Sequence, residues 1–316
     1  MPAFFPVKVT KFVPLNLYQT QTKMNLLDGK FLAQQIKDEL KAAVESLKAQ
    51  GGKAPHLAAV LVGDDPASQA YVRNKVRSCE EVGFGSTLIR KDAHTTEAEL
   101  LEIVAHLNAN PEIDGFIVQL PLPKHIDENK VTLAINPRKD VDGFHPVNFG
   151  RMAQGLPAYL PATPFGILEM LRRYDIPTQG KEVVVIGRSN IVGTPMSILL
   201  SRKGNPGDAT VTICHSRTRD LAEHARRADI LIVAIGRAEM VTADMVKPGA
   251  VVIDVGMNRV DDPALPKGYR LTGDVDFQSV APKASWITPV PGGVGQLTVM
   301  ALLMNTLKAA KGEVFG

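Results

Sequence analysis

The chain has 316 residues, of which 45% are hydrophobic and 22% are charged, and its formal net charge is +3. This length suggests two domains or one large α/β unit, and the apolar content excludes a disordered or fibrous protein. No apolar run approaches the ~18 residues of a membrane span, and the small charge gives no indication of nucleic-acid binding. The two cysteines provide neither a disulfide framework nor a zinc site, so we expect a cytoplasmic protein without a bound metal.

Residues 1–23 differ from the rest of the chain. They contain three lysines, three prolines and no acid, and they show no sustained periodicity. They lack the continuous apolar core of a secretory signal and the arginines of a typical transit peptide. We expect a poorly ordered extension, and Met24 is an equally good candidate for the start of translation.

From residue 24 onward, strand and helix patterns alternate. In chain order we expect a helix over 30–50, a strand over 56–63, a helix over 66–82 capped by Asp65, a strand over 86–92, a helix over 96–108, a strand over 115–123 and a short helix over 129–135. Thr163 and Pro164 open the next helix, which is followed by strands at 182–187, 209–214, 230–236, 250–256 and 270–272 and by a final helix over 296–311. This alternation is typical of parallel sheets with helices on both faces. Because the pattern repeats on either side of about residue 145, we expect an α/β fold of two lobes.

A glycine turn between a predicted strand and a predicted helix is the most informative local feature. Residues 183–195 read VVVIGRSNIVGTP, and Thr194 and Pro195 are expected as N-cap and first residue of the helix. The amides and positive dipole end of such a helix suit a phosphate. In a G-x-G-x-x-G frame, Ser189 and Val192 replace the second and third glycines, so the dinucleotide fingerprint is not strict. A plain β–α turn is the alternative interpretation.

The next predicted strand favours NADP over NAD. A site for NAD normally has an acid at the end of the second strand, where it binds the ribose 2′-hydroxyl. Residues 214–218 read CHSRT and contain no carboxylate. The hydroxyl of Ser216 and the guanidinium of Arg217 suit a 2′-phosphate instead, and Arg188 can serve the same group. Taken alone, Arg217 is equally typical of a solvated surface arginine.

Two features of the first half are candidates for chemistry. Ser68, Tyr71 and Lys75 share one face of a predicted helix, and a tyrosine one turn from a lysine can exchange protons with it. The alternative is a solvated lysine on an amphipathic helix. Gln119 begins the sequence QLPLP at the end of a buried strand, where ligands of open parallel sheets bind, although a simple proline turn would look the same.

Two further turns are ambiguous when considered singly. Residues 139–143 read KDVDG and place two carboxylates before a glycine, which is usually a solvated turn. Residues 291–295 read PGGVG just before the final helix, and glycines there allow a close approach of backbone or simply a tight turn.

Together these five segments resemble the bifunctional methylenetetrahydrofolate dehydrogenase/cyclohydrolase family. The matching blocks are Tyr71-x-x-x-Lys75, QLPLP at 119–123, KDVDG at 139–143, GRSNIVGxP at 187–195 and PGGVG at 291–295. They occur in the family's order and span about residues 24–311. One position departs from the pattern: Gln296 stands where a proline is expected at the first position of the final helix, which puts the rigidity of that helix start in doubt.

The resemblance implies an active site in the cleft between two lobes. The folate-binding lobe comprises residues 24–145 and is completed by the final helix, 296–316, whereas residues 146–295 form a Rossmann-like NADP-binding lobe. The implied reactions are NADP-dependent oxidation of 5,10-methylenetetrahydrofolate to the 5,10-methenyl cation and hydrolysis of that cation to 10-formyltetrahydrofolate, both in one-carbon metabolism. A homodimer formed through the NADP-binding lobe is also implied.

The resemblance also implies residue roles. Lys75 is the acid/base of hydrolysis, Gln119 tunes it, Tyr71 packs beside the folate, and Asp142 binds the amino-pyrimidine edge of the pterin. Further expected folate contacts are Leu120, Pro121, Pro291, Gly292 and Gly293. The expected cofactor contacts are Gly187, Arg188, Ser189, Ile191, Val192, Gly193, His215, Ser216, Arg217, Thr218, Gly236 and Gly256. An NADP-dependent dehydrogenase of another small substrate and a non-catalytic NADP-binding protein remain as alternatives.

Overall fold

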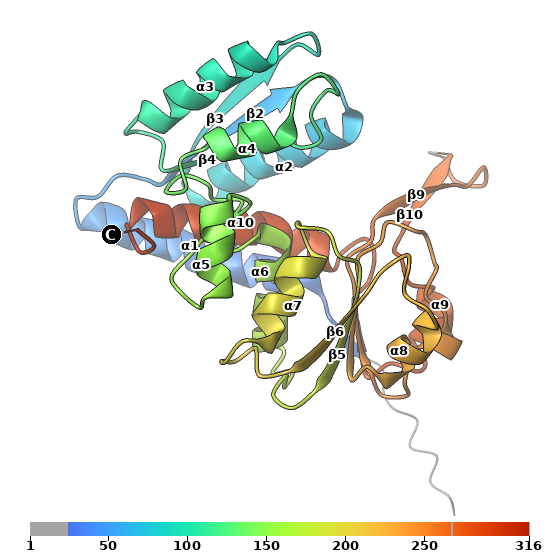
Figure 1. Ribbon diagram of the computed structural model, residues 1–316. Helices are drawn as coiled ribbons and strands as arrows, with labels where there is room; N and C mark the ends of the chain where they lie inside the picture. The colour runs from blue at the N-terminus through green and yellow to red at the C-terminus, as the bar shows by residue number, and fades with distance from the viewer. Residues whose placement is uncertain (1–24, 267, 316) are drawn as a thin grey trace, which may run out of the picture.

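The structure is a computed structural model that describes residues 25–266 and 268–315. The predicted extension, residues 1–23, lies outside the described residues. Two α/β lobes are joined by long helices that run between them (Figure 1). The two-lobe α/β fold with mostly parallel sheets is thus confirmed. None of the helices within the described ranges is long and apolar enough to cross a membrane.

The first lobe is built on a three-stranded parallel sheet in the order β3-β2-β4. Its elements are β2 (His56–Val62), α2 (Pro66–Val82), β3 (Gly85–Lys91), α3 (Glu97–Ala109), β4 (Gly115–Val118) and α4 (Glu128–Ala134). Successive side chains of a strand point to opposite faces. In β2, Ala58 and Val60 accordingly pack in the cluster of α3 and α4, whereas Leu57 and Leu61 pack in the cluster of α2 and the long helices.

The second lobe is built on a six-stranded sheet in the order β1-β11-β8-β7-β5-β6, and every pairing in it is parallel. Its strands are β1 (Asn25–Leu26), β5 (Glu182–Ile186), β6 (Thr210–Cys214), β7 (Ile230–Val233), β8 (Val251–Asp254) and β11 (Trp286–Ile287). Its helices are α7 (Gly193–Ser201), α8 (Leu221–Arg227), η1 (Ala243–Met245) and α9 (Phe277–Val280). A separate antiparallel hairpin of β9 (Asn258–Asp261) and β10 (Tyr269–Thr272) extends from this lobe (Figure 1).

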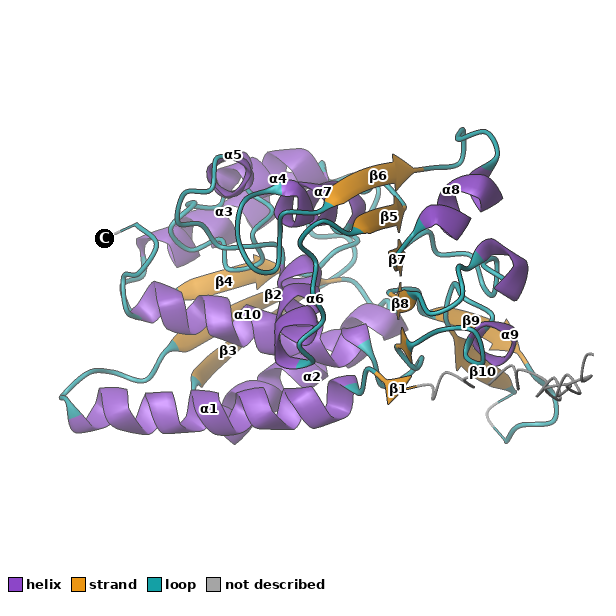
Figure 2. Cartoon of the chain, turned by 90° about the horizontal axis from the view of Figure 1, so that it is seen from below, coloured by secondary structure: helices purple, strands orange, loops and turns teal. Residues whose placement is uncertain are grey.

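Four helices connect the lobes: α1 (Gly29–Ala49), α5 (Pro146–Ala153), α6 (Ala162–Arg173) and α10 (Val294–Ala310). Figure 2 shows α6 between the two sheets and α1 and α10 running from the first lobe toward the second. Most of α10 is buried, which explains why its sequence is apolar on nearly every side. Near its end, buried Asn305 donates to the carbonyl oxygens of Val141 and Leu160, both at 2.9 Å. This side chain ties the final helix to the segment that precedes Gly143.

The expected elements are all present, but several boundaries differ. The strands expected over 115–123, 230–236 and 250–256 end at residues 118, 233 and 254. The short elements β1, β11, α5, α8 and α9 were not predicted. The pairing of β1 with β11 also places residues 25–26 in the sheet of the second lobe, although sequence assigned them to the first.

Two predicted helix caps are wrong. Helix α6 begins at Ala162 with Pro161 at the N-cap, and Thr163 instead shares a 3.0 Å hydrogen bond with Thr298. Helix α7 begins at Gly193, so Thr194 lies inside its first turn and donates to the carbonyl oxygen of Arg188 at 3.1 Å. In both cases the threonine hydroxyl bonds to a different segment rather than to its own helix.

Candidate active site

The four predicted catalytic residues line one cavity of about 260 Å³ between the lobes. Tyr71, Lys75, Gln119 and Asp142 come from the first lobe. The remaining wall is formed by Leu120, Phe144, Ala162, Thr163, Ile191, Val255, Met257, Val294, Gly295, Thr298 and Val299. A ligand in this cavity therefore contacts both lobes and the start of α10.

Lys75 is oriented by the helix that carries it and by Gln119. Asp65 caps α2 by accepting from the backbone N–H of Ser68 at 2.7 Å, and Lys75 follows two turns later with only 8% of its surface exposed. Its Nζ donates to Oε1 of Gln119 at 3.0 Å, while Nε2 of Gln119 donates to the carbonyl oxygen of Leu120 at 2.7 Å. The second bond fixes the amide so that its oxygen faces the lysine.

Burial lowers the pKa of Lys75, and the nearby Asp142 carboxylate opposes part of this effect. Burial likewise raises the pKa of Asp142, while the positive charge of Lys75 lowers it. Desolvation disfavours the charged form of each group. The cavity therefore holds an amine that loses its proton more readily than an exposed lysine does.

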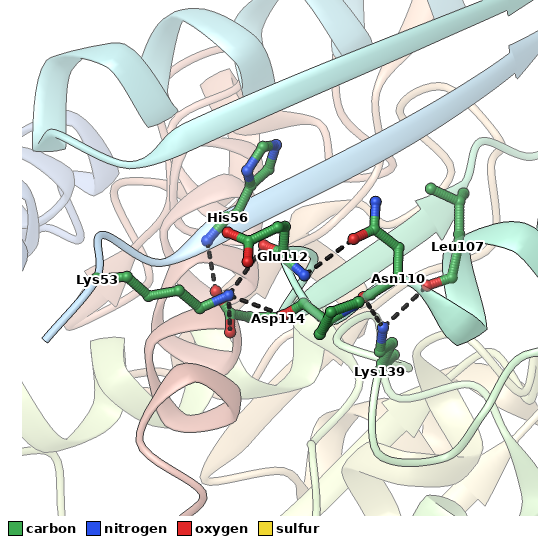
Figure 3. Close-up of polar contacts among 8 residues, drawn as sticks. Lys53, His56, Leu107, Asn110, Glu112, Asp114 and Lys139 are labelled. Atoms are coloured by element: carbon green, nitrogen blue, oxygen red, sulfur yellow. Dashed lines mark hydrogen bonds and ion pairs between the residues drawn. The ribbon is translucent and has the colours of Figure 1, made fainter.

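The loop that carries Asp142 is anchored on both sides. Figure 3 shows Nζ of Lys139 between the carbonyl oxygens of Leu107 and Asn110, at 2.9 and 2.5 Å. These oxygens lie at the end of α3, where a cation also complements the helix dipole. On the other side, Gly143 has a φ of +74°, and a Cβ there would lie 2.6 Å from the carbonyl carbon of Leu160. Only glycine fits this position, so the position of Asp142 is set by backbone packing.

The neighbouring acid, Asp140, has a structural role. It is buried and accepts from the backbone N–H of His145 at 2.8 Å and from Nδ2 of Asn148 at 2.9 Å. Burial raises its pKa to about 7, although these hydrogen bonds oppose the shift. The two carboxylates of the KDVDG segment thus lie in different surroundings, one in the fold and one in the cavity.

A second cavity of about 260 Å³ lies at the carboxyl ends of β5, β6 and β7. Four predicted cofactor residues line it, namely Gly187, Arg188, His215 and Ser216. The other lining residues are Ile186, Leu221, Ala234, Ile235, Arg237 and Met240. None of these described lining residues is acidic, and two are arginines. This set fits the phosphates of NADP.

Two glycines allow the backbone to approach closely beside this second cavity. Gly187 has a φ of +130°, and a Cβ on it would lie 2.2 Å from the carbonyl oxygen of Ala234. A Cβ on Gly193 would lie 2.0 Å from the carbonyl oxygen of Gly187. Gly187 therefore allows the close approach of the chain that follows β7, and Gly193 allows the start of α7 to pack against Gly187.

Sequence comparison identifies the family. Residues 27–142 match the model of the tetrahydrofolate dehydrogenase/cyclohydrolase catalytic domain, and residues 161–314 match that of its NAD(P)-binding domain. The bifunctional protein FolD of Cytophaga hutchinsonii is 63% identical over 91% of this chain and 99% of its own length. That of Porphyromonas gingivalis is 60% identical over 92% and 99%. The chain belongs to the tetrahydrofolate dehydrogenase/cyclohydrolase family.

Solved structures of family members have the same architecture. The FolD dehydrogenase/cyclohydrolase of Campylobacter jejuni superposes with a TM-score of 0.86 at 47% identity, covering 92% of this chain and 99% of the other. The Trypanosoma brucei enzyme, complexed with NADP cofactor and an inhibitor, has a TM-score of 0.87 at 38% identity, with coverages of 93% and 99%. The family predicted from the five sequence blocks is therefore confirmed.

Some family motif residues do not line the cavity that was predicted for them. Ile191, predicted as a cofactor contact, lines the interlobe cavity instead. Pro121, Pro291, Gly292 and Gly293 line neither cavity, whereas Val294 and Gly295 do line the interlobe one. Gly293 is the N-cap of α10, and a Cβ on Gly29 would lie 2.0 Å from its carbonyl oxygen. The PGG segment thus packs against the start of α1.

Gln296 does not occupy the first position of the final helix, the position expected for it from the sequence. Helix α10 begins at Val294, so Gln296 is its third residue rather than its first. Its backbone N–H donates to the carbonyl oxygen of Gly293 at 3.2 Å, a bond that a proline cannot make.

The remaining cofactor-motif residues shape the two turns. The hydroxyl of Ser189 accepts from the backbone N–H of Val192 at 3.1 Å, and that of Thr218 accepts from His215 at 2.9 Å. The backbone N–H of the exposed Arg217 donates to Nδ1 of His215 at 3.2 Å. Of the two predicted phosphate ligands on this turn, Ser216 lines the cavity and Arg217 does not.

Several lining residues were not predicted from the sequence. Arg237 follows β7, and Met257 follows β8, at the same edge of the sheet as the recognised turns. The carboxyl ends of all neighbouring parallel strands are candidate ligand positions. The same rule, applied to β7 and β8 as well as to the strands that precede the recognised motifs, predicts Arg237 and Met257 as ligand contacts. Throughout the part of the chain that the structure describes, no group of three or more His, Cys, Asp or Glu is arranged to bind a metal.

Proposed function

We propose that this chain oxidises 5,10-methylenetetrahydrofolate with NADP and then hydrolyses the 5,10-methenyl product to 10-formyltetrahydrofolate, both in the interlobe cavity. The observation that carries the proposal is the buried Lys75–Gln119 pair beside Asp142, in a cavity whose other wall belongs to the nucleotide lobe. The relatives named above are bifunctional proteins or dehydrogenase-cyclohydrolases. A dehydrogenase of another small substrate would use the second cavity but would have no role for this lysine.

The oxidation depends on positioning. NADP, when bound, supplies the hydride acceptor. Loss of hydride from the methylene carbon is driven by the lone pairs of its two flanking nitrogens, so the chain needs to provide orientation and no strong base. Arg188, Ser216 and Arg237 would hold the cofactor phosphates. Tyr71, whose hydroxyl lies 3.6 Å from Sδ of Met257, would pack beside the folate across the cleft.

The hydrolysis depends on Lys75. Water forms a bond to the cationic methenyl carbon and gives one proton to the neutral amine, which leaves a neutral hydroxyl adduct. The ammonium then returns that proton to the nitrogen whose bond to this carbon breaks, and the hydroxyl proton passes to solvent as the formyl C=O bond forms. Burial already lowers the pKa of Lys75, and a cationic substrate beside it would lower that pKa further. The oxygen of Gln119 accepts from the amine and keeps it directed into the cavity.

Asp142 would bind the pterin. The amino-pyrimidine edge presents N–H donors, and a carboxylate accepts such a pair with charge-assisted bonds. Burial raises the pKa of Asp142 and the positive charge of Lys75 offsets only part of this rise, so the N–H donors of a bound pterin would supply the hydrogen bonds that favour the anionic carboxylate.

We also propose a cytoplasmic homodimer that associates through the NADP-binding lobe. Both cysteines are free and buried, which suits a reducing compartment.

Strand β6 is an edge of the six-stranded sheet, and Ile213 on it is 38% exposed. Exposed strand edges readily pair with another chain. Light scattering after gel filtration should give twice the chain mass, and a monomer at micromolar concentration would contradict the dimer.

The two reactions can be tested separately on purified protein. Methylenetetrahydrofolate with NADP should yield NADPH, and methenyltetrahydrofolate without any nucleotide should be hydrolysed faster than in buffer. Reduction of NADP without hydrolysis would favour the other-dehydrogenase alternative. Nucleotide binding without either reaction would favour the non-catalytic one.

A further inference from the structure

Three consecutive backbone N–H groups after β7 converge on one buried carboxylate. The N–H groups of Ile235 and Gly236 donate to Oδ2 of Asp274 at 2.7 and 2.9 Å, and that of Arg237 donates to Oδ1 at 2.8 Å. Nδ2 of Asn258 donates to Oδ1 at 2.8 Å. Asp274 is fully buried, and these four donors match the four acceptor sites of an ionised carboxylate.

The segment held in this way is a wall of the second cavity. Ile235 and Arg237 line it, and Gly236 between them has a φ of +67°. Because the middle residue, Gly236, has a left-handed conformation, the three N–H groups point toward the same side. Asp274 is the acceptor that all three share there. The shape of this wall therefore depends on Asp274, which does not line the cavity itself.

The surrounding chain is shaped to admit this carboxylate. A Cβ on Gly256 would lie 2.3 Å from Cγ of Asp274, so Gly256, predicted as a cofactor contact, leaves the space that Asp274 occupies. Asp254 in turn accepts from the backbone N–H groups of Asp274 and Val275 at 3.0 and 2.9 Å. A Cβ on Gly273 would lie 1.7 Å from Oδ2 of Asp254. Gly256 thus leaves space for the carboxylate of Asp274, and Gly273 leaves space for that of Asp254. Asp254 in turn holds the backbone of Asp274 in place.

We propose that Asp274 is a positioning residue for NADP, which acts by fixing the backbone of residues 235–237 and does not contact the cofactor. This inference rests on the proposed function, in which the second cavity binds NADP. The carboxylate is specifically required, because an asparagine keeps one acceptor oxygen and turns an amide N–H₂ toward backbone N–H groups.

The test compares Asp274→Asn with wild type in two measurements. Titration calorimetry with NADP should show a dissociation constant raised at least about tenfold, since hydrogen bonds to a charged acceptor are lost. Hydrolysis of methenyltetrahydrofolate without nucleotide should stay within about twofold of wild type, because Lys75, Gln119 and Asp142 all belong to the first lobe and Asp274 does not line the interlobe cavity. The matched control is Asp276→Asn, which alters a carboxylate two residues away that caps α9 through Ser279 and should leave NADP affinity unchanged.

A second variant covers the case in which Asp274→Asn does not fold. Gly236→Ala adds a Cβ that meets nothing within 4 Å, yet it strains a φ of +67° and so disturbs the same turn. It should weaken NADP binding and leave hydrolysis intact. Wild-type NADP affinity in either folded variant, or an equal loss of NADP binding and hydrolysis, would overturn the positioning role. Wild-type protein that binds no NADP would instead overturn the proposed function.

Discussion

Replacing Lys75 with methionine separates the two reactions. Methionine keeps most of the length and apolar volume of lysine in this buried position but removes the amine. Lys75 is the one amine among the described residues that line the interlobe cavity. General acid–base catalysis typically contributes about 10²–10⁴-fold, so hydrolysis should fall at least about a hundredfold. Hydride transfer needs no proton acceptor here and should fall by less than about tenfold, through lost positioning.

The assay follows methylenetetrahydrofolate and NADP by absorbance. In the variant, the methenyl species should accumulate alongside NADPH, because its formation continues while its hydrolysis stops. The matched control is Lys308→Met, which removes another lysine whose pKa is lowered by burial but whose Nζ lies 4.5 Å above the ring of Phe165, outside the cavity. This control should retain both activities. If hydrolysis survives in Lys75→Met, or if both activities vanish in a folded variant that still binds folate and NADP, the acid/base role of Lys75 is refuted.

Three further predictions concern the two ligands and the pH dependence of stability. Asp142→Asn should raise the KM for folate about tenfold or more and leave the Kd of NADP unchanged, and similar losses for both ligands would contradict the assignment of Asp142 to the pterin. Because Arg188, Ser216 and Arg237 line the second cavity without an acid, kcat/KM should favour NADP over NAD by more than about tenfold, and equal values would refute this reasoning. Burial raises the pKa of Asp140 from 3.8 to about 7, so the native state binds a proton more tightly than the unfolded chain. The free energy of unfolding should therefore fall by up to about 4 kcal/mol from this group as the pH rises from about 4 to 7. Urea denaturation should show that the free energy of unfolding falls less steeply with pH over this range in Asp140→Asn than in wild type. An equally steep fall in both proteins would exclude the effect.

Local signals predicted much of the first lobe and its site. Asp65 and Pro66 do begin α2, and that helix carries Lys75 into the cavity. Gln119 directly follows a buried strand, where the geometry of parallel sheets places ligand-binding groups. These residues were predictable because each depends on the element next to it in sequence.

Contacts between distant segments account for what the sequence did not reveal. The cap of α6 was assigned to Thr163, but that hydroxyl bonds to Thr298 on α10. Strand β1 has two residues and exists through its pairing with β11 at the other end of the chain. Asp274 follows β10, and its partners at 235–237 lie on another loop. No local periodicity encodes such pairs, because they are fixed only when the sheet assembles.

Competitive inhibition by a folate that does not react can show whether one cavity serves both reactions. A non-reacting folate such as folic acid should occupy the space beside Lys75 and Asp142 and block the dehydrogenase and the cyclohydrolase together. The inhibition constants for the two activities, measured competitively against each folate substrate, should agree within about twofold if the site is shared. Inhibition of one activity at concentrations that leave the other unaffected would show two separate folate sites and contradict the account.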